Sequence, residues 1–495
     1  MVCKLVRPNV IGDILINNLI FSIIVNVIIV VTFSFYNLDN LDYYIVSLSI
    51  TGFLVFYHVI LYVKKADYYS PVGVVSVVMY YFFFIAPLLH INYGYYYSFF
   101  YESYENWFDS YNDWTFLNLI GVVIYYGILH YFNIFKVNPK KKKLISFSNL
   151  PKNKFIITIT ILLLISLAFQ LIIYSKFGSV KNYIVAKEVY GLDAYDGLGK
   201  YALVAESFPI MLMFLLAFTY RNRVVIPFWE VIVIIVVFII VKFFFGGFSG
   251  SRSNIVWSLF WCVGIITFFI KKIGIKFYLI SLLSLVAFML VYGVYKKHGT
   301  EFINVVQSEG IKSNNYKSEN TDSVLLMSLM TDFSRADIQT FSIYSQSDGT
   351  YKNLRFGETY LASILIFLPK SIVEFERKSI PGAELLHGIE GMQTTRVFGM
   401  VGEFMINFPY QLYPILFVLF ALITKKSELF YLKLEKRDIR LLIVPFFTNL
   451  SFVLLISDSD NVMFFILKNG VIPILFVLFM GRYLSTNARE RSELT

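Results

Sequence analysis

The chain has 495 residues, of which 57% are hydrophobic and only 15% are charged. Soluble domains carry about 25% charged residues, so the composition excludes an ordinary soluble domain and indicates a protein whose main solvent is lipid. The net charge of +10 is typical of basic loops that face anionic lipid. We therefore expect a membrane-lipid partner and no nucleic acid.

The N-terminal segment and the two cysteines offer no candidate catalytic or metal-binding residues. Lys4 and Arg7 precede a first apolar run that is too long for the core of a signal peptide, and no small-residue cleavage site follows it. This run is predicted to be a retained first helix. Cys3 and Cys262 should lie at different depths, so the sequence predicts neither a disulfide nor a cysteine metal site.

Apolar runs long enough to cross a bilayer recur along almost the whole sequence. A span needs about 20 mostly apolar residues. The pattern predicts an all-α, polytopic integral membrane protein with about twelve transmembrane helices. The predicted spans are Ile14–Phe35, Tyr43–Val63, Val72–His90, Thr115–Phe135, Phe155–Tyr174, Tyr201–Tyr220, Ile226–Phe245, Ser253–Ile270, Ile275–Tyr292, Phe398–Ile423, Leu441–Ile456 and Asn461–Met480.

Basic residues alternate between the predicted loops and set the orientation. With the N-terminus inside, the inner loops include the lysine-rich and arginine-rich stretches Lys136–Lys154 and Lys425–Arg440. The outer loops Tyr36–Asp42 and Ile91–Trp114 contain neither lysine nor arginine. Because cytoplasmic loops carry the excess of positive charge, both termini are expected in the cytoplasm.

The spans divide the chain into three parts. Residues 1–292 hold helices 1–9, residues 293–397 form a large outer loop, and residues 398–495 hold helices 10–12 and a cytoplasmic tail. Within the loop, Val324–Gln346 has apolar residues at helical spacing and predicts an amphipathic helix. Tyr360–Leu368 is apolar but short, and Pro369 follows it, so we expect a re-entrant or interfacial helix there.

The stretch Phe245-Gly-Gly-Phe-Ser-Gly-Ser-Arg-Ser-Asn254 joins two spans on the expected outer side. Small residues let a ligand approach the backbone, and free N–H groups can hold an anion. Arg252 adds a planar donor fork that suits phosphate. A tight helical hairpin with a snorkelling arginine would explain the same residues equally well.

The large loop carries further cations. Arg335 and Asp337 lie on the predicted amphipathic helix, and Arg355, Arg377 and Arg396 follow. A basic cluster above a membrane suits a diphosphate-linked lipid headgroup. Ordinary ion pairs in a solvated loop are the alternative for each residue taken singly.

Several acidic residues and one histidine could move protons. Glu384, His387 and Glu390 lie near the end of the loop and could deprotonate a sugar hydroxyl, although a position on a surface loop is the more common explanation for each residue taken singly. Glu403 lies in the first turns of an apolar helix, where a carboxylate is costly and is usually functional or paired. Glu206 and Lys468 have the same status, whereas Lys242 is expected to snorkel towards a helix end.

Two other outer features have less specific chemistry. The aromatic loop Asn92–Asp109 could stack sugar rings, although an interfacial aromatic belt is the more common reason for such a composition. The acidic pairs Asp39/Asp42 and Asp458/Asp460 could hold a divalent metal, but such residues are also frequent helix caps.

Three segments together resemble a known family. They are Ser249-Gly-Ser-Arg252, Ser334-Arg335-x-Asp337 and Val401-Gly-Glu-Phe-x-x-Asn-Phe408. With one large outer loop in the C-terminal half, the chain resembles the O-antigen and capsular oligosaccharide repeat-unit polymerases of the bacterial inner membrane. The third segment departs from the family pattern, because Pro409 stands where a glycine is expected.

The resemblance implies a GT-C-like glycosyltransferase that joins undecaprenyl-diphosphate-linked oligosaccharides in the periplasm. It implies no metal and no cofactor, and it suggests a chain-length regulator protein as a partner. Arg252 and Arg335 would bind the diphosphate, and Glu403 would be a catalytic or positioning carboxylate. Position and chemistry add Arg377 and Arg396 as diphosphate binders, and Glu384 and His387 as candidate bases.

Three other functions remain open. An O-antigen ligase would share the topology and could use His387 as its base. A flippase for lipid-linked oligosaccharides would show two similar halves and a basic central cavity, of which the sequence shows little. A membrane O-acyltransferase would need a histidine within a span, and His58 is the residue that best meets this condition.

Overall fold

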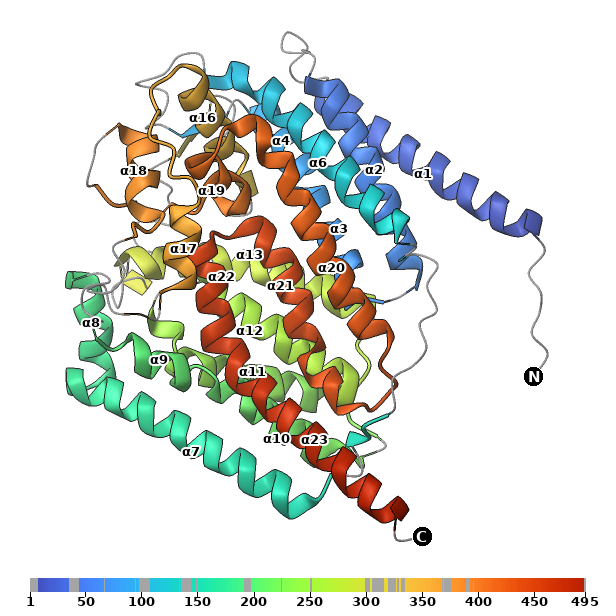
Figure 1. The fold of residues 1–495 in the computed structure, drawn as a ribbon, viewed down its shortest axis with the longest axis vertical. Helices are drawn as coiled ribbons and strands as arrows, with labels where there is room; N and C mark the ends of the chain where they lie inside the picture. Colours follow the sequence, from blue (N-terminus) through green and yellow to red (C-terminus); the bar gives the residue numbers. More distant parts are fainter. Residues whose placement is uncertain are drawn as a thin grey trace. The chain divides into compact units, whose positions relative to one another are not determined.

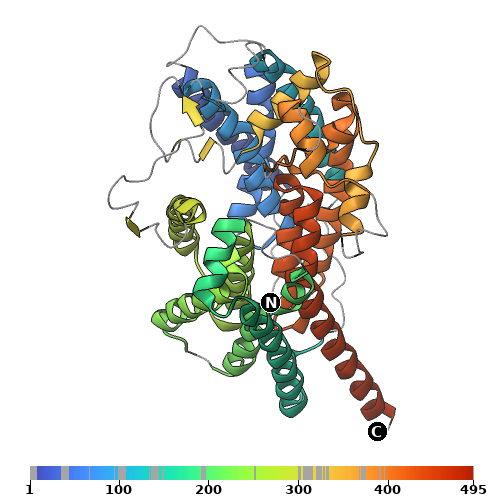
Figure 2. The same ribbon diagram turned by 90° about the vertical axis from the view of Figure 1, so that its left-hand side faces the viewer.

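The computed structural model describes most of the chain, drawn in colour in Figures 1 and 2. The chain divides into two compact units. The first unit comprises residues 1–137, 313–428 and 451–460, and the second comprises residues 138–312, 429–450 and 461–495. The described residues are 8–34, 44–65, 67–93, 95–97, 107–132, 134, 144–147, 150–190, 197–223, 225–249, 252–298, 303–304, 316–318, 326, 329–330, 334–366, 368, 375–388, 392–394 and 396–493.

Long apolar helices from the N-terminal part of the chain form most of the first unit (Figure 1). Ser70 caps one of them by accepting a hydrogen bond from Gly73 N at 3.2 Å, and Pro71 stands at its first turn, where no N–H is needed. The helices are α1 (Pro8–Ser34), α2 (Tyr44–Lys65), α3 (Pro71–Tyr80), η2 (Tyr81–Ile85), α4 (Ala86–Tyr93), η3 (Trp107–Ser110) and α6 (Tyr111–Tyr131).

Hydrogen bonds at both ends of α6 show that it runs antiparallel to the continuous segment α3–η2–α4. Near the end of α6, Tyr126 donates to Ser76 Oγ at 2.8 Å. At its start, the hydroxyl of Tyr111 lies 3.0 Å from Nδ1 of His90, close to the end of α4. This is the alternation that consecutive membrane spans require.

Short helices from the predicted outer loop, together with α19 from the predicted tenth span, form a cap in the first unit. The cap lies near the end of α4 and the start of α6 (Figures 1 and 2). An apolar core that includes Phe341, Leu385 and Phe398 holds the cap together. Its helices are α16 (Ala336–Ser347), α17 (Glu358–Ile364), α18 (Ser379–His387) and α19 (Gly399–Asn407), and β1 (Tyr95–Tyr97) pairs with β2 (Tyr316–Ser318) in a short antiparallel ladder.

The predicted amphipathic segment Val324–Gln346 is described only in part. Its regular helix, α16, is buried at nearly every position from Ala336 to Ser345. The apolar residues that predicted amphipathic character precede α16, and Leu326, Leu329 and Met330 among them pack with Leu89. The amphipathic character of this segment stays a prediction.

The run Tyr360–Leu368 forms only the short helix α17, which buries Ala362 and exposes Leu361. Its expected re-entrant or interfacial position stays a prediction.

The predicted tenth span is not one helix. After α19 ends at Asn407, Phe408 and Pro409 leave the helical conformation, and the chain resumes as η9 (Tyr410–Ile415) and α20 (Leu416–Leu432). Pro409 cannot continue the hydrogen-bond ladder of α19, and Pro414 shapes the turn that follows. The break leaves α19 in the cap.

The second unit is also helical. The ends of its helices contact one another in the pattern expected of membrane spans that alternate in direction. The ring of Phe155 at the start of α7 stacks on Phe218 near the end of α10, with centroids 4.1 Å apart. Tyr174, near the end of α7, donates to the carbonyl of Phe244, the last residue of α11. The helices that lie wholly in this unit are α7 (Lys152–Phe177), α8 (Val180–Tyr190), α9 (Gly199–Ala205), α10 (Phe208–Tyr220), α11 (Phe228–Phe244), η6 (Gly247–Ser249), α12 (Arg252–Ile265), η7 (Ile266–Ile270), α13 (Ile275–His298), η10 (Ile439–Ile443), η11 (Ile466–Gly470) and α23 (Val471–Glu493).

Besides α20, whose residues after Glu428 belong to the second unit, two helices near the C-terminus contribute residues to both units. They are α21 (Val444–Ile456), whose residues from Ser451 onward belong to the first unit, and α22 (Ser459–Phe465), whose first two residues do. The segment between them, with Asp458, therefore belongs to the same unit as the cap.

Eight described helices are long and apolar enough to cross a membrane, which confirms the multi-span, helical class but not the number twelve. They are Ile45–Val63, Pro71–Tyr93, Tyr111–Tyr131, Lys152–Phe177, Gly199–Tyr220, Arg252–Ile270, Ile439–Ile456 and Ser459–Tyr483. Three further predicted spans are helices that fall short of this measure over their described residues, namely α1, α11 and α13.

Candidate functional site

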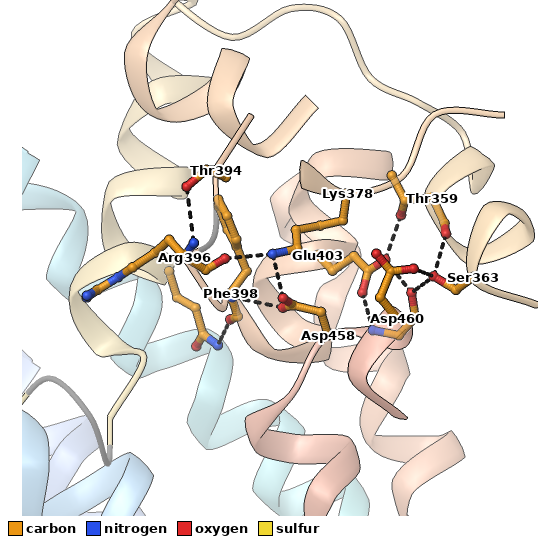
Figure 3. Close-up of polar contacts among 11 residues, drawn as sticks. Thr359, Ser363, Lys378, Thr394, Arg396, Phe398, Glu403, Asp458 and Asp460 are labelled. Carbon is orange, nitrogen blue, oxygen red and sulfur yellow. Dashed lines mark hydrogen bonds and ion pairs between the residues drawn. The ribbon is translucent and has the colours of Figure 1, made fainter. Parts of the chain in front are cut away.

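Glu403 is the centre of the most connected polar cluster in the cap (Figure 3). It lies on α19, outside the eight candidate spans, and is 0% exposed. Thr359 donates to Oε1 at 2.7 Å. Ser459 donates twice, from its backbone N to Oε2 at 2.6 Å and from its hydroxyl to Oε1 at 2.6 Å. The carboxylate therefore ties together three segments that lie far apart in the sequence.

Asn407 extends this network from the other end of α19. Its side-chain amide donates to Thr359 Oγ1 at 2.7 Å and to the carbonyl of Glu403 at 2.8 Å. Its oxygen accepts from Gly357 N at 3.0 Å. The Glu and Asn of the motif Val-Gly-Glu-Phe-x-x-Asn-Phe thus both hold the start of α17, one turn apart on the same helix face.

The surroundings of Glu403 decide its protonation. Burial, together with the nearby carboxylate of Asp458, raises the pKa of Glu403 to about 7. The hydrogen bonds from Ser459 and Thr359 oppose this rise. Because both oxygens already accept hydrogen bonds from the chain and the side chain has no exposed surface, Glu403 is suited to position the cap and not to contact a substrate directly.

Asp458 belongs to a buried ion pair in the same cluster. Lys378 Nζ lies 2.6 Å from its Oδ2, and Phe398 N donates to its Oδ1 at 2.8 Å. Lys378 also donates to the carbonyl of Arg396 at 2.6 Å. Asp460 accepts a hydrogen bond from Ser363 at 2.6 Å, so both members of the Asp458/Asp460 pair have partners within the chain. No group of His, Cys, Asp or Glu that could hold a metal ion occurs among the described residues.

The motif segment Ser334–Asp337 of the large loop and the motif segment Val401–Phe408, which begins in α19, lie in the same cap. Arg396 forms an ion pair with the fully buried Asp337. Arg335, two residues before that aspartate, is half-buried and donates to the carbonyl of Ser334 at 2.6 Å. Gln339, on the same helix, donates to the carbonyl of Phe398 at 2.9 Å. The structure thus brings Arg335, Arg396 and Glu403 into one cap.

The other predicted cap residues lie at its rim. Arg377 is half-buried and precedes Lys378. Glu384 on α18 is engaged by Arg355, whose Nη2 lies 2.9 Å from Oε2, and by the amide of Asn353. His387 is half-buried at the end of α18, and burial lowers the pKa of its imidazole. A neutral imidazole is the form that can accept a proton.

Arg252 lies in the second unit as the first residue of α12 and is half-buried. Its expected meeting with Arg335 and Glu403 stays a prediction. Close to it in sequence, Asn254 joins a buried charged cluster with Glu206, Lys242 and Lys468. Lys242 is 0% exposed and does not snorkel, because Glu206 Oε2 lies 3.5 Å from its ammonium group.

Some residues of these sites carried no recognisable signal in the sequence. Thr359 and Ser459 are single hydroxyl residues in unremarkable positions, and only the fold makes them partners of Glu403. The sequence shows that Glu403 and Asn407 are one helical turn apart, but it does not show that both side chains contact Thr359. Glu390, Asp39, Asp42 and most of the aromatic loop Asn92–Asp109 lie outside the described residues.

No known protein family, no curated protein and no solved structure matches the chain. A functional assignment therefore rests on the geometry of the cap and on the sequence motifs it contains.

Proposed function

We propose that this chain is a membrane glycosyltransferase that polymerises undecaprenyl-diphosphate-linked oligosaccharide repeat units on the periplasmic face of the bacterial inner membrane. One observation supports the proposal best. Ser334–Asp337 and Val401–Phe408 resemble separate motifs of one polymerase family, and both lie in a single cap, where α16 packs against α19 with Gln339 next to Gly402. Motifs that serve one reaction are expected to meet.

The reaction needs a cationic site for the leaving diphosphate and a group that accepts the proton of the attacking sugar hydroxyl. Arg335 and Arg377 carry cations on the cap, and Arg252 carries one in the second unit. Arg396, the fourth candidate diphosphate binder, forms an ion pair with Asp337. His387 is the candidate base that fits best, because Glu384 is already paired with Arg355. Glu403 serves as a positioning carboxylate.

Deletion of the gene in its host tests the proposal, with gel analysis of the lipopolysaccharide. Loss of the polymerase should leave core plus one repeat unit, because single units still reach the ligase. Bare core would contradict the proposal and favour the ligase or the flippase. Unchanged long chains would exclude all three functions.

Single variants then test the assigned residues. Arg335→Ala and Arg252→Ala should reproduce the deletion, because each removes a donor fork for the diphosphate. Lys352→Ala is the matched control, since Lys352 is an exposed cation of the same cap and should leave long chains unchanged. Normal polymer from an expressed Arg335→Ala protein would remove this site assignment.

A further inference from the structure

A second polar cluster lies inside the second unit, where four segments meet. Glu206 stands at the junction of α9 and α10, Lys242 in the last turn of α11, Asn254 in the first turn of α12 and Lys468 in the π-helix η11. Glu206 Oε1 lies 2.9 Å from Lys468 Nζ and Oε2 lies 3.5 Å from Lys242 Nζ. Asn254 donates to Oε2.

The backbone is adapted to this cluster. Gly246 has a φ of +98°, and a Cβ there would lie 2.5 Å from Cδ of Glu206. Only glycine leaves room for the carboxylate at this turn. Asn469, next to Lys468, donates to Asn254 Oδ1 at 3.2 Å and so fixes the orientation of the amide. π-helical turns often occur at functional sites.

The charges of the cluster do not balance. Among the described residues, two lysines face one carboxylate, so the cluster holds one more basic group than acidic groups. Lys242 is 0% exposed, and the described residues offer its Nζ no hydrogen bond beyond the 3.5 Å ion pair. A buried ammonium with unused N–H donors is favoured when an anion is close.

One member of the cluster is reachable. The side chain of Lys468 is 24% exposed, whereas that of Glu206 is 2% exposed. Lys468 lies in the candidate span Ser459–Tyr483. Arg252 precedes Asn254 by two residues on α12 and is half-buried. An anion entering beside Lys468 would therefore approach a strongly cationic segment.

We propose that Lys242 and Lys468, oriented by Glu206, form a binding subsite for the phosphate groups of a diphosphate anion. Each ammonium group has N–H donors that Glu206 does not use, and these can turn to phosphate oxygens. The assignment of that anion to a polyprenyl diphosphate headgroup rests on the proposed function. The subsite itself rests on the charge, burial and geometry of the cluster.

Binding to the full-length protein, purified in a maltoside detergent that carries no phosphate, tests the subsite. The probes are undecaprenyl diphosphate and inorganic diphosphate, added separately. Lys468→Met and Lys242→Met should each weaken binding roughly tenfold, because each removes a charge-assisted contact. Lys468→Arg should retain binding. Lys152→Met, which removes an exposed lysine on α7, is the control for the loss of one charge.

A second variant guards against a lysine variant that fails to fold. Glu206→Gln removes the carboxylate that competes for both ammonium groups but keeps a hydrogen-bond acceptor. It should bind inorganic diphosphate at least as tightly as the natural protein, whereas a purely structural ion pair predicts only a loss of thermal stability. Equal affinity of Lys468→Met and Lys152→Met, or no binding by the natural protein, would overturn the subsite.

The two probes separate the sources of the anion. Lysine-dependent binding of undecaprenyl diphosphate alone supports a lipid headgroup, and lysine-dependent binding of both probes supports a subsite for diphosphate in general. Unchanged polymer after gene deletion would refute only the proposed function. Either binding result would still support the subsite. Conversely, loss of polymer with lysine-independent binding would refute only the subsite.

Discussion

Glu403 illustrates how a single buried carboxylate can organise a segment of this protein. Its partners come from α17 and from the start of α22. Its hydrogen bonds therefore hold together segments that are far apart in the sequence. A carboxylate inside an apolar run is usually paired, neutral or functional, because burying an isolated charge is costly. Here hydrogen bonds and a raised pKa both contribute to its accommodation.

The pH dependence of stability follows from that pKa. Burial raises the pKa of Glu403 from 4.5 to about 7, so the folded state holds a proton that the unfolded state has released. Its contribution is fully present below pH 4.5 and is lost as the pH rises to about 7, by about 3 kcal/mol in all. The thermal unfolding midpoint should therefore decrease as the pH is raised from about 4.5 to about 7. Glu403→Gln should flatten this dependence, and an unchanged slope would contradict the assignment.

Lys378 and Asp458 form a buried pair whose two halves depend on each other. Their side chains are 7% and 0% exposed. Lys378→Met should reduce the free energy of unfolding by about 3–5 kcal/mol, because it leaves a buried charge without its partner. The double variant Lys378→Met, Asp458→Asn should recover part of that loss. Additive effects in this double-mutant cycle, measured by thermal unfolding, would show that the pair is not coupled.

At the scale of elements, α19 depends on one glycine. Gly399 begins the helix with a φ of +71°, and a Cβ there would lie 2.9 Å from the carbonyl oxygen of Leu455. The positive φ of Gly399 and the close approach of the Leu455 carbonyl both require a residue without a side chain. The motif glutamate and asparagine are placed by this start.

Gly399→Ala should therefore destabilise the cap by more than the roughly 1–2 kcal/mol of left-handed backbone strain. Gly388→Ala is the matched control, because its φ is +64° and no atom lies within 4 Å of its Cβ position. The thermal unfolding midpoints of the two variants give the comparison. Equal shifts would mean that the contact with Leu455 contributes nothing.

Helix existence was predictable from composition, but helix continuity was not. The apolar runs correspond to helices in both units because a long apolar segment has few alternatives in lipid. Phe398–Ile423 is equally apolar, yet it divides at Asn407. Pro409 and Pro414 were visible signals of that division. Their effect depends on the cap that receives α19, which hydropathy does not describe.

At the scale of the whole molecule, the charge pattern of the loops predicts which side each segment faces. Single cysteines can test it in a protein whose own Cys3 and Cys262 have been replaced. A cysteine at Lys352, exposed on the cap, should react with a membrane-impermeant maleimide in intact cells. A cysteine at Lys436, exposed in a predicted inner loop, should react only after the cells are opened. The reverse result would exclude periplasmic chemistry.

By itself, the sequence determined that this is a helical membrane protein with many spans, and it located Glu403, Glu206 and Lys468 as charges that needed an explanation. Partition into lipid depends on the composition of each segment alone. The tertiary structure decided the partners: Ser459 for Glu403, Lys378 for Asp458, and two lysines for one glutamate in the second unit. Such pairings join residues that lie far apart in the chain, so they follow only from how the helices pack.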